Sequence, residues 1–451
     1  MHVFGSSGVR GVAGETMTPG FVLQIAQATG SVWTDDYDRV AVGRDTRTTG
    51  RTLANAAISG LTSLGLDVDR VGVVPTPGLQ AYCGRNEVPG LMVTASHNPP
   101  AYNGVKVVGA DGVGLTRDAL NRIETALDDD AVAHVGWAET GTDRTVESAR
   151  RTYREAVVAA VDAERIAAAD LTVVVDPGHG AGSLVSPDLF RELGCTVHTV
   201  HAQPDGHFPG RNPEPVPENL ADLRAYVEST GADLGIAHDG DADRAMFVDE
   251  TGTHVPGESS LAALAAAELE PGDTVVSAVN ASQRLVDAAE AADADLSLSP
   301  IGSTNIVSRI RALEEAGETV PVAGEGNGGL FFPRYRIARD GAYTAARFCE
   351  LVAVTPASEL VEPYSDYHTV RRGLEYDDEA EREAMLGRVE AYATDADADL
   401  DTTDGWRLNY GDAWVLARPS GTEPIVRVYA EARDVDRAAS LADELVDVAR
   451  S

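Results

Sequence analysis

The chain repeats one local pattern: a short apolar run, a glycine-rich or charged turn, and a longer segment whose apolar residues have helical spacing. Apolar runs of this kind lie at residues 40–42, 71–74, 171–175, 234–237 and 275–278. Strands that alternate with helices pack into sheets covered by helices. The pattern therefore predicts an α/β protein with mixed sheets. At roughly 100–200 residues per domain, 451 residues predict three or four domains.

Polar stretches near residues 139–150, 249–257 and 361–366 divide the chain into three α/β blocks and a shorter tail. In the tail, strand-like runs at 414–417 and 425–429 flank a turn, and a helix-like segment follows at 436–450. An antiparallel sheet with helices is expected there. The predicted domains are residues 1–145, 146–252, 253–364 and 365–451.

The charge of the chain restricts its partners and its cellular setting. With 72 acidic and 36 basic residues, the formal net charge is −36. Such a charge disfavours nucleic acid and anionic membranes as partners. It predicts the cytoplasm of a halophilic archaeon, and no signal peptide or membrane span is recognisable in the sequence. The cysteines, Cys83, Cys195 and Cys349, indicate neither a disulfide framework nor a zinc site. The sequence leaves the oligomeric state open.

Lys106 is the only lysine among the 36 basic residues. A lysine can change its protonation state when its surroundings shift its pKa, whereas an arginine stays charged. Ser96 lies ten residues upstream, in a small-polar loop at 94–99 that directly follows an apolar run. A candidate nucleophile and a candidate acid/base group thus share one neighbourhood. The alternatives are an ordinary turn at Ser96 and a compositional accident at Lys106.

Three further loops carry groups suited to a phosphorylated sugar. Asp239, Asp241 and Asp243 alternate in a tight turn and suit a hard cation such as Mg²⁺, with a phosphate on Ser96 as a further ligand. In the glycine-rich loop at 324–329, Glu325 and Asn327 can hydrogen-bond sugar hydroxyls. The loop at 418–424 combines a guanidinium, hydroxyls and free amides, which suits a phosphate that is not transferred. The alternatives are a surface turn for the first loop and a flexible hairpin for the second.

TASHNP at 94–99, DGDADR at 239–244, the Gly-Glu loop at 324–329 and RPSGTEP at 418–424 resemble, in this order, motifs of the α-D-phosphohexomutase family. The likeness spans the chain from Gly5 to Tyr429. It implies three similar mixed-sheet α/β domains and a fourth, TATA-binding-protein-like α+β domain around a central cleft. It also implies an isomerase that interconverts hexose 6-phosphate and hexose 1-phosphate, with Mg²⁺ and a hexose 1,6-bisphosphate intermediate.

The resemblance implies a role for each matched residue. Ser96 is the phosphoserine and a metal ligand together with the three aspartates, and Arg244 lies beside its phosphate. Arg10 and Lys106 flank the reacting oxygen, and Lys106 is a candidate acid/base group. Glu325 and Asn327 contact the sugar. The distal phosphate is held by Arg418, Ser420, Gly421 and Thr422.

The chain departs from many bacterial members of the family, which carry serine and histidine where this chain has Asn327 and Gly329. Archaeal-type members are similar to this chain there. The missing histidine puts a second acid/base group in doubt, and His97, His179 or His207 can replace it. Two rival functions are a Mg²⁺-dependent phosphatase with a seryl-phosphate intermediate and a non-catalytic sugar-phosphate sensor.

The motifs are compatible with several sugar phosphates as the substrate. The opening Phe-Gly-Ser-x-Gly-Val-Arg-Gly at 4–11 is similar to the phosphoglucosamine mutase branch, which favours glucosamine phosphate. Phosphomannomutase, phosphoglucomutase and phosphopentomutase activities are the alternatives.

Overall fold

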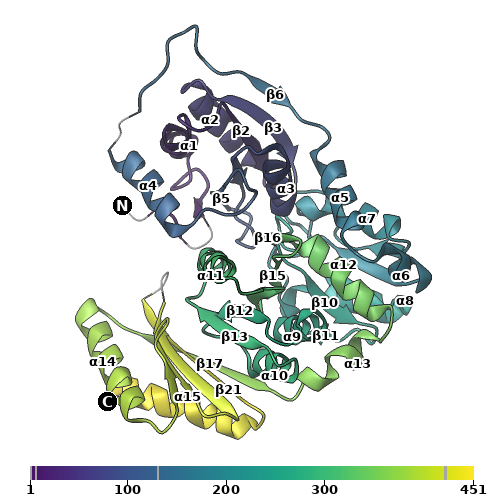
Figure 1. Ribbon diagram of the computed structural model, residues 1–451, viewed down its shortest axis with the longest axis vertical. Helices are drawn as coiled ribbons and strands as arrows, with labels where there is room; N and C mark the ends of the chain where they lie inside the picture. The colour runs from purple at the N-terminus through teal and green to yellow at the C-terminus, as the bar shows by residue number, and fades with distance from the viewer. Residues whose placement is uncertain (1–2, 6–7, 130–131, 421–423) are drawn as a thin grey trace.

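The computed structural model describes residues 3–5, 8–129, 132–420 and 424–451. Their strands form four separate sheets that follow one another along the chain, one with six strands and three with five. The first three sheets are mixed and flanked by helices, and the fourth is antiparallel with helices packed against it (Figure 1). The expectation of three mixed α/β domains and an α+β fourth domain is confirmed. None of the helices in the described ranges is long and apolar enough to cross a membrane.

Domain I has the strand order β1-β5-β4-β2-β3-β6, in which β5 runs antiparallel to both of its neighbours. Every residue of the central strand β4 is buried, which is typical of a sheet covered on both faces. Lys106 of β5 lies opposite Met92 of β4, while its neighbours Val105 and Val107 are buried in the core. The elements are β1 (Val9–Val12), α1 (Pro19–Trp33), β2 (Arg39–Arg44), α2 (Gly50–Thr62), β3 (Asp67–Val73), α3 (Thr76–Asn86), β4 (Gly90–Val93), β5 (Tyr102–Val108), α4 (Arg117–Asp128) and β6 (Asp143–Thr145).

Domain II has the order β11-β10-β9-β7-β8, and β10 runs antiparallel to β9. Its strands β7 and β9 are buried Val/Ile/Leu-rich runs, as the sequence pattern indicates. The elements are α5 (Ala149–Ala159), α6 (Ala163–Ala168), β7 (Thr172–Asp176), η1 (Ala181–Leu184), α7 (Ser186–Glu192), β8 (Thr196–Thr199), η2 (Pro217–Asn219), α8 (Ala221–Thr230), β9 (Leu234–Ala237), β10 (Met246–Asp249) and β11 (His254–Val255).

Domain III has the order β13-β12-β14-β15-β16, and β14 and β15 form a hairpin around the glycine-rich loop. Helix α12 begins after Asp340, whose side chain caps it by accepting from the Tyr343 amide. The elements are α9 (Gly257–Glu268), β12 (Thr274–Ala278), α10 (Gln283–Ala291), β13 (Asp295–Ser299), α11 (Ser303–Glu315), β14 (Ala323–Glu325), β15 (Gly329–Phe332), β16 (Arg336–Arg339), α12 (Gly341–Val352), α13 (Ala357–Val361) and η3 (Glu362–Tyr364).

Domain IV has the antiparallel order β17-β21-β20-β19-β18. Two long helices pack against this sheet and bury an apolar cluster separate from those of the other domains. The elements are β17 (His368–Glu375), α14 (Glu379–Asp395), β18 (Asp399–Asp401), β19 (Trp406–Asn409), β20 (Ala413–Pro419), β21 (Ile425–Ala432) and α15 (Val435–Arg450).

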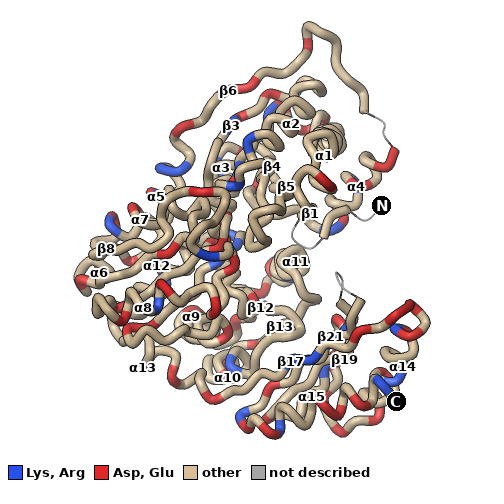
Figure 2. The backbone as a smooth tube through the Cα atoms, turned by 180° about the vertical axis from the view of Figure 1, so that it is seen from behind, with Lys and Arg blue, Asp and Glu red and all other residues tan. Residues whose placement is uncertain are grey.

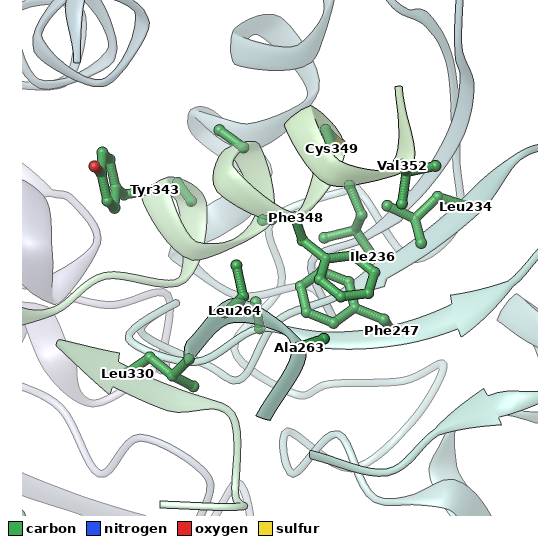
Figure 3. Packing of buried hydrophobic residues seen from close by; sticks show 14 of the residues in the cluster. Leu234, Ile236, Phe247, Ala263, Leu264, Leu330, Tyr343, Phe348, Cys349 and Val352 are labelled. Carbon is green, nitrogen blue, oxygen red and sulfur yellow. The ribbon is translucent and has the colours of Figure 1, made fainter. Parts of the chain in front are cut away.

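Domains II and III share one hydrophobic core. The ring of Phe247 on β10 stacks on the ring of Phe348 on α12, with centroids 4.1 Å apart. Leu234 of β9 and Val352 of α12 lie on one side of this pair, and Ala263 and Leu264 of α9 lie on the other (Figure 3). Because close-packed interiors resist deformation, the loops at the ends of β9 and β14 are held in a fixed relation.

Domain IV is attached to domain III mainly through polar contacts. The buried carboxylate of Glu431 on β21 accepts hydrogen bonds from Ser282 Oγ, the Gln283 amide and Arg284 Nη1. Arg407 of β19 donates to the carbonyls of Val279 and Ala281 at 2.6 and 3.1 Å. A buried charge of this kind requires its partners, and in this arrangement of the two domains both Glu431 and Arg407 have them.

Acidic residues occur along the backbone of all four domains, with basic residues interspersed among them (Figure 2). The excess of acidic residues is therefore spread along the chain and does not come from one segment. Several arginines are buried inside the molecule, and Arg47, Arg244 and Arg339 lie beside the loops described below.

Candidate active site

The loop that holds Ser96 joins β4 to β5. Ser96 is fully buried and has a positive φ of 50°, which is uncommon for a residue with a side chain. Its hydroxyl donates to Asp239 Oδ2 at 2.6 Å, and its amide donates to Thr94 Oγ1 at 2.9 Å. The candidate nucleophile of domain I thus points toward domain II, at the loop between β9 and β10 that contains Asp239, Asp241 and Asp243. This loop is called the carboxylate loop below.

Arg47 fixes the backbone of the Ser96 loop. Its guanidinium donates to the carbonyls of Ser96 and Asn98 at 2.8 and 2.6 Å, and to those of Pro99 and Tyr102 at 2.7 and 2.9 Å. Its Nε pairs with Asp45 at 3.1 Å. A single planar guanidinium therefore orients the whole turn after β4.

The loop between β9 and β10 places three buried carboxylates together. One ligand oxygen from each of Asp239, Asp241 and Asp243 lies within 4.8 Å of the others. Gly240 lies against the Ser96 loop, since a Cβ there would come within 2.7 Å of the Ser96 carbonyl oxygen. Ala242 has a positive φ of 54°, so both facing loops carry a strained residue.

Fixed donors from domains I and III occupy one oxygen of two of these carboxylates. Lys106 Nζ lies 2.6 Å from Asp241 Oδ2 and 2.8 Å from Asp243 Oδ2. Thr76 Oγ1 also donates to Asp241 Oδ2, and Arg339 Nη2 donates to Asp243 Oδ2 at 2.6 Å. The remaining oxygens, Asp241 Oδ1 and Asp243 Oδ1, are buried without a hydrogen-bond partner among the described residues.

His97 approaches the Ser96 hydroxyl, and the charges of Arg10 and Arg244 act on His97. His97 Nδ1 lies 3.4 Å from Ser96 Oγ, and Arg10 Nη1 donates to Asn98 Oδ1 at 2.8 Å. The guanidinium of Arg244 lies 4.0 Å from the carboxylates of Glu214 and Asp243. Burial, followed by the charges of Arg244 and Arg10, lowers the pKa of His97 to about 2, so its imidazole is neutral.

A cavity of about 530 Å³ opens beside Arg244 and is bordered by domains II, III and IV. Glu325 and Asn327 line it, with Asn327 Oδ1 accepting from the Gly329 amide at 3.0 Å. The cavity also receives residues that the sequence patterns do not single out. These are Glu214, His254, Glu258, Asn280, Arg371 and Tyr429.

Arg418 lies apart from these groups, at the end of β20, and does not line this cavity. Its Nη2 pairs with Asp404 Oδ2 at 3.0 Å, and the same carboxylate oxygen accepts from the Ile301 amide of domain III at 3.1 Å. The Ser420 amide donates to the Ile425 carbonyl at 2.9 Å. Gly421 and Thr422 lie outside the described residues.

Four models of one known protein family match the chain, and the segments that they match correspond closely to the four sheets. Phosphoglucomutase/phosphomannomutase models match α/β/α domain I at residues 1–133, domain II at 151–252, domain III at 256–367 and the C-terminal domain at 375–448. The chain belongs to this family. It is a phosphohexomutase-family protein with all four domains.

Relatives and solved structures agree with this membership. The phosphoglucomutase/phosphomannomutase of Thermococcus kodakarensis is 41% identical over 97% of this chain and 96% of its own. A probable phosphoglucosamine mutase of Methanopyrus kandleri is 40% identical over 99% of this chain and 97% of its own. The crystal structure of a family protein from Burkholderia thailandensis covers 99% of this chain and 97% of its own, with a TM-score of 0.87 and 29% identity.

The carboxylate loop of this family member fits a divalent cation. Two of its buried oxygens lack a partner among the described residues, and hard cations bind such carboxylate oxygens. Burial and the charges of Asp243 and Asp241 raise the pKa of Asp239 to about 7. Against the effect of burial, Arg339 and Lys106 lower the pKa of Asp243. A cation bound among the three carboxylates would offset the repulsion from Asp243 and Asp241 that contributes to the raised pKa of Asp239.

Arg47, Thr76 and Arg339 are site residues of this phosphohexomutase fold that the sequence patterns missed. Arg47 lies in the charged turn after β2, and the sequence of this turn is typical of a simple connection between a strand and a helix. Thr76 begins α3, and Arg339 ends β16. Nothing in their local sequence indicates the site, because each reaches it through tertiary packing.

The histidines offered as replacements for the one missing at Gly329 differ in their placement. His97 lies at Ser96, as described. Both ring nitrogens of His179 are used, one with the Gln203 carbonyl and one with the Gly210 amide. The exposed His207 pairs with Asp205. Neither His179 nor His207 contacts Ser96 or lines the cavity beside Arg244.

Proposed function

We propose that this protein is a phosphohexomutase that moves a phosphate between C1 and C6 of a hexose through phosphorylated Ser96. The observation that carries the proposal is the 2.6 Å contact of Ser96 Oγ with Asp239, in a buried site that also holds Lys106, Arg339 and Arg244. Phosphoryl transfer requires mainly positioning and charge stabilisation. Both are supplied by groups fixed before substrate arrives.

In the proposed reaction, phosphorylated Ser96 gives its phosphate to a free hydroxyl of a hexose monophosphate. The bond between phosphorus and Ser96 Oγ breaks and a bond to the sugar oxygen forms. Lys106 gives a proton to the leaving Ser96 Oγ and takes the proton of the sugar hydroxyl, so its own charge is the same before and after the transfer. When bound by Asp239, Asp241, Asp243 and an oxygen on Ser96, Mg²⁺ would neutralise charge on the phosphoryl oxygens. Arg10 and Arg244 supply further positive charge.

The second half of the reaction returns the other phosphate to Ser96. The hexose 1,6-bisphosphate turns over within the cleft, so that the phosphate already present on the substrate faces Ser96. The loop with Arg418, Ser420, Gly421 and Thr422 is proposed to hold whichever phosphate is distal. This requires domain IV to approach the cavity, since Arg418 lies outside it in the structure.

We favour glucosamine phosphate as the substrate, with mannose, glucose and pentose phosphates as alternatives. Three carboxylates, from Glu214, Glu258 and Glu325, line the cavity together with Asn327. An ammonium group is attracted to such a lining, whereas a hydroxyl gains only hydrogen bonds. The relative from Methanopyrus kandleri bears the name probable phosphoglucosamine mutase.

Intact mass and peptide mapping of the isolated protein test the phosphoserine. A phosphate on Ser96, together with loss of mutase activity in Ser96→Ala, is expected. Phosphate on another residue with Ser96→Ala fully active would remove the assignment. Measuring inorganic phosphate release in the same assay separates a mutase from a phosphatase.

Kinetics on a panel of sugar phosphates test the preference for an amine. We expect the highest kcat/KM on glucosamine 6-phosphate, and a selective loss for that substrate in Glu325→Gln. Asn327→Ala should raise KM for every hexose phosphate of the panel. Equal effects of Glu325→Gln on glucosamine and mannose phosphates would contradict the role given to its charge.

A further inference from the structure

The carboxylate loop is a long connection between two paired strands. The ladder between β9 and β10 ends at Ala237 and Met246, so residues 238–245 form the connection. Hairpin loops usually have two to five residues, because short turns fix the strands directly. A longer loop with several like charges needs other contacts to hold one conformation.

His238 supplies such a contact at the point where the backbone ladder ends. Its side chain is fully buried. Its Nδ1 lies 2.8 Å from the carbonyl oxygen of Arg244, and its Nε2 lies 2.9 Å from Ser186 Oγ at the start of α7. Because a carbonyl oxygen only accepts hydrogen bonds, Nδ1 carries a proton and donates it. One imidazole thus joins the first residue of the loop to its far end.

The backbone of His238 is fixed independently of its ring. Its amide donates to the Asp176 carbonyl at 3.0 Å, and its carbonyl accepts from Arg211 Nη2 at 2.7 Å. Arg211 is itself held by a buried ion pair with Asp176 at 2.8 Å. The ring therefore extends from a rigid base, and the position that it imposes on Arg244 is well defined.

We propose that His238 is a positioning residue that holds Arg244 and Asp243 in place by closing the carboxylate loop. The Arg244 carbonyl is the atom held, and Asp243 directly precedes it in the chain. Asp243 Oδ1 is one of the two carboxylate oxygens left for a cation, and Arg244 lines the cavity that contains Glu325 and Asn327. Loss of the Nδ1 contact removes the hydrogen bond that fixes the backbone carrying these two side chains.

Two substitutions separate the two hydrogen bonds of the ring. The amide nitrogen of asparagine lies near the position of Nδ1, so His238→Asn retains a donor for the Arg244 carbonyl. The amide of glutamine lies near the position of Nε2, so His238→Gln retains a partner for Ser186 and loses the loop closure. Ser186→Ala removes the other bond without altering His238, which makes it a matched control.

Mn²⁺ binding followed by electron paramagnetic resonance tests the proposal without substrate, so it stands apart from the mutase activity. Supporting residues around metal ligands change affinity by about 10- to 100-fold. We expect a loss of that size in His238→Gln, and affinities close to the native value in His238→Asn and Ser186→Ala. Thermal unfolding of each variant reports its stability separately.

Native Mn²⁺ affinity in His238→Gln, or an equal loss in His238→Asn, would overturn the proposal. If His238→Gln does not fold, weakened Mn²⁺ binding in a folded Ser186→Ala or His238→Asn protein would still overturn it. In the mutase assay, His238→Gln should lower kcat more than it raises KM, because Asp243 and Arg244 are proposed to act on the phosphate that is transferred. If His238→Gln changed KM alone, His238 would not act through the carboxylate loop, which would contradict the proposal.

Discussion

Lys106 occupies a position that suits an ammonium group and not a guanidinium. From β5 its Nζ contacts Asp241 and Asp243 at 2.6 and 2.8 Å, so one compact charge bridges two carboxylates. Arg339 already approaches Asp243 from the other side. The longer side chain of an arginine, with its planar guanidinium, would displace one of these groups. The single lysine of the chain thus has a geometric role in addition to the proposed proton transfer.

Lys106→Arg is expected to lower kcat by at least about 10²-fold, the low end of the contribution of general acid–base groups. The charge is retained, while the ability to exchange a proton and the short reach are lost. Steady-state kinetics of the purified variant measure the effect. Arg85→Lys, at an exposed position of α3, is a control for the exchange of the two residue types. Near-native turnover of Lys106→Arg would leave Lys106 as an electrostatic contact only.

His201, which follows β8 in domain II, is expected to make the free energy of unfolding depend on pH. Its hydrogen bond with Asp176 raises its pKa against the opposing effect of burial. A raised histidine pKa adds stability that is fully present below the ordinary value of about 6.5 and is lost as pH rises through the folded-state value. His201→Gln should therefore reduce the free energy of unfolding more at about pH 5.5 than at about pH 8.5.

Denaturant unfolding of both proteins at the two pH values measures this difference. Asp222 and Arg211 also face the ring of His201, the first raising and the second lowering its pKa. His207→Gln, at an exposed site, is the control. A destabilisation by His201→Gln that grows toward alkaline pH would show that the sign of the shift is wrong.

At the scale of elements, the turn between β2 and α2 supports the loop between β4 and β5. The two connections are distant in sequence and adjacent in the sheet, because β2 pairs with β4. Arg47 joins them through four carbonyls and Asp45, and Thr94 Oγ1 donates to the same carboxylate at 2.7 Å. The conformation of the Ser96 loop is therefore set by a neighbouring connection as well as by its own residues.

Arg47→Met should destabilise the protein by about 3–5 kcal/mol, because it leaves Asp45 without its buried partner. Chemical denaturation measures this loss. Any folded fraction should show reduced phosphorylation of Ser96, since the loop loses four hydrogen bonds. Arg70→Gln removes an exposed pair with Asp143 and should change stability by less than about 1 kcal/mol. Equal effects of the two substitutions would contradict the role of Arg47.

At the scale of the whole molecule, domains II and III behave as one body and domain IV as another. The first two share a hydrophobic core, whereas domain IV contacts domain III through Glu431, Arg407 and a small apolar cluster around Trp414. Inter-domain contacts of a polar kind permit relative motion. The movement of Arg418 toward the cavity is expected to occur at this interface.

Glu431→Gln should destabilise the docking of domain IV by about 3 kcal/mol, because Arg284 loses its buried counter-charge. Limited proteolysis between α13 and β17 and small-angle scattering measure the separation of the domains. Arg433→Gln, which removes an exposed pair with Asp287 at the rim of the same interface, is the control. Scattering curves identical to the native one would show that Glu431 does not determine the docking.

The net charge of −36 predicts that the compact state requires concentrated salt. Repulsion is screened over about 3 Å at 1 M salt but extends about 30 Å at 0.01 M. Circular dichroism and activity should both decline toward about 0.01 M KCl and recover near about 2 M. A chain equally stable and active at both concentrations would remove the halophile interpretation and leave the family membership unaffected.

The sequence by itself determined which residues of the site lie at strand ends or in the loops that follow them. Ser96, Asp239, Asp241, Asp243, Glu325 and Asn327 all follow or interrupt apolar runs, and their residue types fit phosphate, cation and sugar chemistry. These features depend on neighbours along the chain, so a sequence pattern contains them. The architecture of four domains was predictable for the same reason, since alternation of strands and helices is local.

Only the tertiary structure decided which groups from other elements complete these loops. Arg47, Thr76 and Arg339 reach the site because the strand order differs from the chain order and because domains I and III both close on the β9–β10 loop. Contact between residues so far apart in sequence depends on sheet pairing and core packing, which leave no mark on the local sequence. The position of Arg418 depends likewise on how domain IV docks on domain III, through charges that are buried only once the two domains meet.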